Sequence, residues 1–329
     1  MFVRPTTIRL AIIVAVLLVV TPLSAEAQQA GKVYRVGMLE RASMTVNAAN
    51  LDAFRRGLRE LGYVEGKNVA IEYRSVEGRN ERYADLATEL VRLKVDVILT
   101  RGTPATLAAR NATGTIPVVM TGIGDPVGSG IVASLARPGG NITGLTAQGE
   151  VYPKRVELLK ELVPRAVRIA ALFNMSNPAN AGEWKQVETA ARSLGLQPQL
   201  LDARTPEDLT QAFAAAIRQH ADGLIVGLDA VTQANHRLIV DLAARHRLPT
   251  IYASSTEFVG GLISYGVDYP DLYRSAAGFV DKIFRGAKAA DLPVEQPTKF
   301  ELVINMRTAK TLGLTIPPSV LLRATQVIE

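Results

Sequence analysis

The chain has 329 residues, of which 48% are hydrophobic and 21% charged, a composition typical of a globular protein with a well-buried core. Its length predicts about two domains. The formal net charge is +6, but the charges are interspersed and form no basic run, which argues against nucleic-acid binding. There is no cysteine, so disulfide bonds, thiolate chemistry and zinc–sulfur or iron–sulfur sites are excluded.

Residues 1–27 are predicted to be a cleavable secretory signal peptide. Arg4 and Arg9 precede an apolar run, Leu10–Val20, and a small-x-small cleavage site follows at Ala25–Ala27. The apolar run is too short for an uncleaved membrane anchor, which needs about 20 residues. We therefore expect an exported protein, cleaved after Ala27.

After this segment, strands and helices are predicted to alternate. Apolar runs indicate strands, and apolar residues at helical spacing indicate the helices between them. In the first half we expect four strands, at Val33–Leu39, Asn68–Tyr73, Val95–Thr100 and Pro117–Thr121. Three helices would lie between them. The first would bury Leu51, Phe54, Leu58 and Leu61, the second would bury Tyr83, Leu86, Ala87, Leu90 and Val91, and the third would cover Pro104–Asn111. This spacing predicts a parallel sheet covered on both faces.

The same pattern restarts in the second half. The expected strands are Arg168–Phe173, Gln199–Asp202, Gly223–Gly227, Thr250–Tyr252 and Leu262–Tyr265. Trp184 lies in a helical apolar stripe between the first two strands, so it is interpreted as a core residue. Between the halves, the glycine-rich segment Ala136–Glu150 is interpreted as a strand that crosses from one lobe to the other. Two similar, Rossmann-like α/β lobes with parallel sheets are therefore expected.

Each lobe has a predicted helix start at the end of a central strand. Thr103 would cap a helix that begins at Pro104, and Asn177 with Pro178 matches this pair in the second half. Helix N-termini bind anions, and open α/β sheets bind ligands at the carboxyl ends of their strands. Two such edges facing each other would form a cleft with N–H donors. The alternative is that both are simple helix caps, as expected for Thr205 and Pro206.

A family resemblance becomes specific over the mature chain. The successive motifs are AFRRGLRELGYVEGKNVAIEYRSVEG, VDVILTRGTPATLAARNATGTIPVVMTGIGDPVGSGIVASLARPGGNITGL, KRVELLKELVP and ISYGVDYPDLYRSAAGFVDKIFRGAKAADLPVEQPTKFELVINMRTAKTLGLTIP. In this order they resemble the solute-binding proteins of ABC importers, in the family whose better-known members bind tryptophan and other aromatic amino acids.

The resemblance implies a type I periplasmic binding fold of Venus-flytrap architecture, with three crossover segments and a ligand trapped when the two lobes close. The expected N-terminal lobe comprises residues 31–143 and 268–292, and the expected C-terminal lobe comprises 144–267 and 298–329. The helix that contains Tyr273 and Phe284 would return to the first lobe, and the segment KFELVIN would cross back as a strand of the second.

Candidate ligand-binding residues lie at the strand ends that this fold would turn toward the cleft. Arg101 could pair with a carboxylate, while Asp125 or Asp229 could accept from an amine; alternatively, Arg101 bridges to a surface acid and Asp125 only starts a turn. The resemblance places Asp268 and Tyr269 in a crossing segment. The full set is Glu40, Arg41, Arg101, Gly102, Thr103, Pro104, Asp125, Ser176, Asn177, Asp229, Tyr252, Ser254, Asp268 and Tyr269.

Enzymatic chemistry finds little support in the sequence. There is no Walker-type phosphate loop and no Gly-x-Ser-x-Gly elbow, and the dinucleotide spacing is missed by one residue near Asp125. The three histidines have no metal-ligand spacing, so we expect no catalytic residue, no metal and no cofactor. The expected function is that of a monomeric periplasmic protein that delivers a small solute, an amino acid or related carboxylate, to an inner-membrane ABC permease with its ATPase subunits. The alternatives are a ligand sensor that signals to a receptor and an exported α/β hydrolase.

Overall fold

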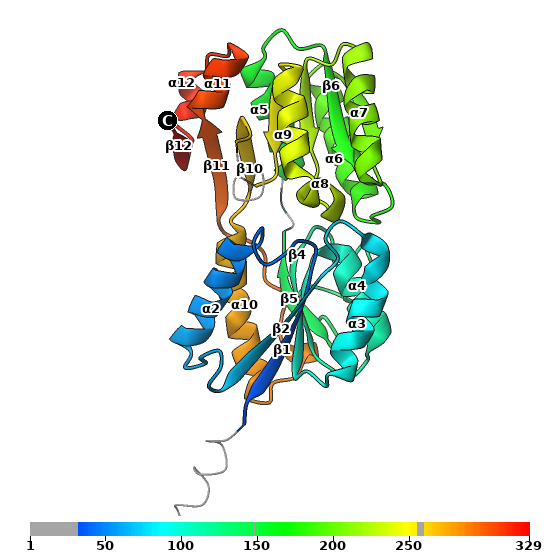
Figure 1. The fold of residues 1–329 in the computed structure, drawn as a ribbon, viewed down its shortest axis with the longest axis vertical. Coiled ribbons are helices and arrows are strands. Elements are labelled where there is room, and N and C mark those ends of the chain that lie inside the picture. Colours follow the sequence, from blue (N-terminus) through cyan, green and yellow to red (C-terminus); the bar gives the residue numbers. More distant parts are fainter. Residues whose placement is uncertain (1–31, 148, 150, 255–259) are drawn as a thin grey trace, which may run out of the picture.

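The computed structural model describes residues 32–147, 149, 151–254 and 260–329, and it folds into two α/β lobes stacked along the long axis of the molecule (Figure 1). The prediction of two lobes with largely parallel sheets is confirmed. The predicted signal peptide lies outside the described residues. Among the described helices, none is both long and apolar enough to cross a membrane.

The first lobe is built on a five-stranded parallel sheet of order β2-β1-β3-β4-β5. Along β1, Val36 and Met38 face one apolar cluster while Leu39 faces another, because successive side chains of a strand point to opposite faces. The elements of this lobe are β1 (Tyr34–Glu40), α2 (Ala48–Glu60), β2 (Val69–Ser75), the short 3-10 helix η1 (Asn80–Arg82), α3 (Tyr83–Arg92), β3 (Val97–Arg101), α4 (Gly102–Ala112), β4 (Val118–Ile123), β5 (Ile142–Thr146) and α10 (Tyr269–Phe284).

Helix α10 comes from the second half of the sequence but packs on the first lobe beside α2, as Figure 1 shows. The two helices approach closely at Gly57. A Cβ atom there would lie 2.6 Å from the carbonyl oxygen of Arg274 and 2.8 Å from Cβ of Ala277. Both distances are too short for real contacts, so this close approach requires glycine. The pair α2–α10 thus covers one face of the sheet, and α3 with α4 covers the other.

We expect the substitution Gly57→Ala to destabilise the protein, because the added methyl group must push α2 away from α10. Overpacking of this kind costs about 1–3 kcal/mol of unfolding free energy. Gly278→Ala on α10 is a matched control, since a Cβ atom there meets no neighbour within 4 Å, and alanine favours a helix over glycine by up to about 1 kcal/mol. Urea denaturation of both variants checks the prediction, which is wrong if Gly57→Ala is as stable as the control.

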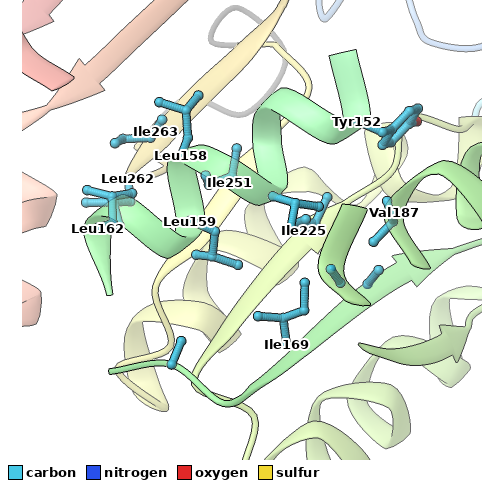
Figure 2. Close-up of a cluster of buried hydrophobic side chains, with 14 of the residues drawn as sticks. Tyr152, Leu158, Leu159, Leu162, Ile169, Val187, Ile225, Ile251, Leu262 and Ile263 are labelled. Atoms are coloured by element: carbon cyan, nitrogen blue, oxygen red, sulfur yellow. The ribbon is translucent and has the colours of Figure 1, made fainter. Parts of the chain in front are cut away.

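The second lobe contains a seven-stranded sheet of order β12-β11-β10-β9-β8-β6-β7, and among the strands that the structure describes there, β10 and β11 pair antiparallel while the other pairs are parallel. Figure 2 shows one of its apolar clusters, where Leu158 and Leu159 from α5 pack on Ile225 and Ile251 of the sheet. Its elements are α5 (Val151–Leu162), β6 (Arg168–Phe173), α6 (Asn180–Ser193), β7 (Gln197–Asp202), α7 (Pro206–Arg218), β8 (Gly223–Val226), α8 (Ala230–Ala234), α9 (His236–Arg245), β9 (Thr250–Tyr252), β10 (Ile263–Val267), β11 (Phe300–Asn305), α11 (Met306–Leu312), α12 (Pro318–Leu321) and β12 (Gln326–Ile328).

The chain passes between the lobes three times, in agreement with the predicted architecture. It leaves the first lobe after β5, returns between β10 and α10, and leaves again between α10 and β11, through the 3-10 helix η2 (Ala289–Asp291). Strand β5 pairs with β4 as far as Thr146, so the expected lobe boundary between residues 143 and 144 falls inside this strand. Backbone bonds from Thr146 to Glu295 and from Asp268 to Lys299 tie neighbouring crossings together.

Candidate ligand-binding site

A cleft of about 460 Å³ lies between the two lobes. It is bordered by the segments that follow β1, β3 and β4 in the first lobe and β6, β8 and β9 in the second, where parallel strands expose their carboxyl ends. Figure 1 shows the strands of the first lobe running toward the second lobe. Both lobes therefore contribute side chains to one cleft, as binding of a ligand between the lobes requires.

Nine of the predicted site residues line this cleft: Arg41, Arg101, Gly102, Thr103, Pro104, Asp125, Asn177, Asp229 and Tyr269. The structure thus brings together strand-end residues that are far apart in the sequence. The guanidinium carbon of Arg101 lies 3.8 Å from the ring centroid of Tyr269, within cation–π range. Arg101 is only 1% exposed, so it forms part of the wall of the cleft.

Five predicted residues do not line the cleft: Glu40, Ser176, Tyr252, Ser254 and Asp268. Glu40 is buried, and its carboxylate accepts a 2.6 Å bond from the Tyr273 hydroxyl. Tyr252 is directed into the apolar core beneath the sheet of the second lobe, because side chains alternate along β9. Asp268 caps α10 by accepting from the Asp271 N–H, and the Ser176 hydroxyl donates to Asn174. Ser254 is buried beyond the end of β9.

The predicted pair of helix caps is wrong at both positions. Helix α4 already begins at Gly102, whose φ of 79° is readily adopted only by glycine, and Thr103 lies inside the helix. Helix α6 begins at Asn180, three residues after Asn177, whose amide oxygen accepts from the N–H of Ala179 in the preceding turn. Thr205 does cap α7 in a reciprocal capping box, as predicted.

Asp229 is the best-anchored carboxylate of the cleft. It is 2% exposed and accepts bonds from the side-chain amides of Asn174 at 2.8 Å and Asn177 at 3.0 Å, and from the N–H of Val231 at 3.0 Å. The last bond makes it the cap of the short helix α8. Three donors therefore hold a negative charge in place at the end of β8.

Several residues that were not predicted also line the cleft, from helices: Tyr83, Tyr152, Arg155, Glu183 and Gln186. Tyr152 and Arg155 lie on α5, and both are buried. A charged residue within the buried stripe of a helix is unusual, so the position of Arg155 in the sequence already indicates a functional role. Glu183 and Gln186 carry no comparable signal, since α6 is polar on most of its surface. Trp184 packs against the core and does not line the cleft.

Glu183 lies where the two lobes meet. Its carboxylate accepts a bond from the Tyr152 hydroxyl, and its Oε1 lies 3.3 Å from the position that a Cβ atom would occupy on Gly124 of the first lobe. Removal of the carboxyl from bulk water raises the pKa of Glu183 to about 7, although the Tyr152 hydroxyl and the positive charges of Arg155 and Arg41 lower it. Glu183 is therefore only partly ionised at neutral pH.

The fold and the cleft define a two-lobed binding protein, in which a small molecule is enclosed between α/β lobes. A sequence model for the family described as "ABC transporter substrate binding protein" matches residues 37–328, and the chain belongs to this family.

Three known proteins are similar to this chain over most of its length. It is 28% identical over 277 residues to the "Tyrosine-binding protein" of Clostridioides difficile, a match that covers 83% of this chain and 80% of the relative. A conserved domain protein from Vibrio cholerae has a TM-score of 0.84 at 28% identity, and the match covers 90% of this chain and all of that one. A Streptococcus pneumoniae ABC domain solved in complex with L-Trp has a TM-score of 0.83, with the same identity and coverage.

Proposed function

We propose that this protein binds an aromatic L-amino acid, such as tyrosine or tryptophan, and delivers it to the permease of an ABC importer. The observation that carries the proposal is the cleft between the lobes, which combines a fixed carboxylate, buried guanidinium groups and aromatic rings. An amino acid carries a carboxylate, an ammonium group and a side chain, and each has a matching environment here.

The charged groups of the ligand have defined partners. Asp229 is held by three donors and suits an ammonium group. Arginine side chains suit a carboxylate, because their N–H groups form a planar fork. The apolar part of the ligand would pack on side chains such as Leu107, Val151 and Tyr83. A volume of about 460 Å³ is within the usual range for small-molecule sites.

Closure of the two lobes is the proposed mechanism. Contacts from both lobes to one ligand stabilise the closed form and shift a pre-existing equilibrium between open and closed forms. The closed form would then dock on the permease, whose ATPase subunits supply the energy for release. The predicted signal peptide supports export to the periplasm. The names of two relatives, a tyrosine-binding protein and an ABC domain in complex with L-Trp, support a carrier of aromatic amino acids, and the sequence shows no recognised catalytic motif.

A thermal-shift screen of the mature protein against the twenty amino acids and common organic acids tests this proposal. At a hundredfold excess over its dissociation constant, a ligand adds about 2.7 kcal/mol to the unfolding free energy, which raises the melting temperature measurably. L-tyrosine or L-tryptophan should give the largest shifts. If both leave the melting temperature unchanged while a different class of solute raises it, the proposed ligand is wrong.

A further inference from the structure

Two buried arginines that line the cleft have donor groups without a partner among the described residues. Arg41 follows β1 in the first lobe and is 7% exposed, and Arg155 lies on α5 in the second lobe and is 4% exposed. The atoms concerned are Nε and Nη2 of Arg41 and Nη1 of Arg155. A buried guanidinium with unused donors costs free energy unless an acceptor is supplied.

Both side chains are fixed in place by their remaining contacts. Arg155 donates from Nε to the carbonyl of Tyr265 at 2.8 Å, and its guanidinium carbon lies 4.6 Å from the ring centroid of Tyr152. Its Nη2 passes 3.3 Å from the position that a Cβ atom would occupy on Gly266, so the backbone there leaves it room. Arg155 is thus held on two sides, while Nη1 is left for another acceptor.

Arg41 reaches across the cleft from the first lobe. Its Nη1 donates to the carbonyl of Leu228 in the second lobe at 3.3 Å, so it already spans the two lobes. Arg41 and Arg155 both act electrostatically on Glu183, which places the two positive charges around one part of the cleft. The charged side chains that line this cleft are Arg41, Arg101, Asp125, Arg155, Glu183 and Asp229, and those of Arg41, Arg155 and Asp229 act on Glu183.

We propose that Arg41 and Arg155 form a clamp, with one arginine from each lobe, that binds the carboxylate of the ligand. The clamp rests on the proposed function and specifies it further, because it makes an acidic group a requirement for tight binding. A carboxylate supplies two oxygens with lone pairs for the unused N–H groups. Since the arginines belong to different lobes, the carboxylate would also stabilise the closed form. This assignment differs from the sequence-based expectation, which gave the role to Arg101.

Calorimetric titration with L-tryptophan and with L-tryptophanamide tests the clamp, because the amide lacks the negative charge of the acid. We expect the wild-type protein to prefer the acid by about a hundredfold, as charge-assisted bonds to a buried arginine are strong. In Arg41→Gln and Arg155→Gln the affinity for the acid should fall at least tenfold while that for the amide stays nearly unchanged. Arg155→Lys should fall in between, because lysine keeps the charge but loses the planar fork.

The controls separate the clamp from folding and from the proposed function. Arg218→Gln, at an exposed end of α7, should bind both compounds as the wild type does. Melting temperatures of the ligand-free clamp variants should change little, since each substitution removes both a buried charge and a bond to a backbone carbonyl. If both clamp variants keep the full preference for the acid, the clamp is wrong and the proposed function stands. If the wild-type protein binds neither compound, the proposed ligand is wrong and the clamp is rejected with it.

Discussion

Replacement of Asp229 by alanine is expected to abolish ligand binding and to destabilise the second lobe. The side-chain amides of Asn174 and Asn177 and the N–H of Val231 would all lose their acceptor in a buried region. Breaking a buried charged network costs about 3–5 kcal/mol. The ammonium group of the ligand would lose its partner as well, so affinity should fall by at least a hundredfold.

Urea denaturation and calorimetric titration with L-tryptophan measure the two effects of the substitution. Asp229→Asn separates them, because asparagine keeps one oxygen acceptor but removes the charge; it should cost less stability yet still bind weakly. Asp241→Ala, at an exposed position on α9, is the matched control and should change neither quantity. The assignment of Asp229 is contradicted if Asp229→Asn binds L-tryptophan as tightly as the wild type.

Ligand affinity is expected to weaken as the pH rises from 5 to 8, because of Glu183. In this structure, where Glu183 lies against the first lobe, its pKa is raised from its ordinary value of 4.5 to about 7, mainly by burial, and we expect the same in the closed form. In the open form water would return the pKa toward the ordinary value. Below pH 4.5 the carboxyl is protonated in both forms and closure carries no penalty. Between pH 4.5 and 7 the open form ionises first, so the closed form loses relative stability, and this loss is complete above pH 7.

One pKa unit corresponds to about 1.4 kcal/mol, so the raised pKa of Glu183 predicts a roughly tenfold to hundredfold weaker affinity at pH 8 than at pH 5. Because Glu183 is partly exposed to solvent, we expect a change closer to tenfold. Glu183→Gln should remove most of this dependence, because glutamine does not titrate. Glu188→Gln on the same helix should leave it intact. Calorimetric titrations with L-tryptophan at several pH values measure this dependence. If Glu183→Gln has the same pH dependence of affinity as the wild type, Glu183 is not the cause of that dependence.

The strands of the fold could be predicted because both lobes bury their sheets on two faces. Continuous apolar runs such as those of β3 and β6 then stand out from the amphipathic helices between them. The strand-end residues Arg101 and Asp229 could be placed in the cleft for the same reason, since the carboxyl ends of parallel strands meet at one edge of a sheet.

The helical side of the cleft could not be predicted in this way. Helical periodicity shows which face of α5 or α6 is buried, but it does not show whether that face meets the core or the opposite lobe. Arg155 and Glu183 face the cleft because of how the two lobes stack, which depends on three crossings far apart in the sequence. The start of α4 also differs from the prediction: capping rules favour a helix that begins at Pro104 after Thr103, whereas α4 begins two residues earlier, at Gly102, whose positive φ suits glycine.

We propose that closure of the two lobes captures a small solute between them. The chain has no cysteine, so two can be introduced and spin-labelled without interference. We choose Val127→Cys in the first lobe and Lys185→Cys in the second, because both positions are exposed and neither lines the cleft. The distance between the two labels is measured with and without saturating L-tryptophan. We expect the ligand to shift a broad distribution of distances to a single shorter distance. An unchanged distribution with the ligand bound would rule out capture by closure.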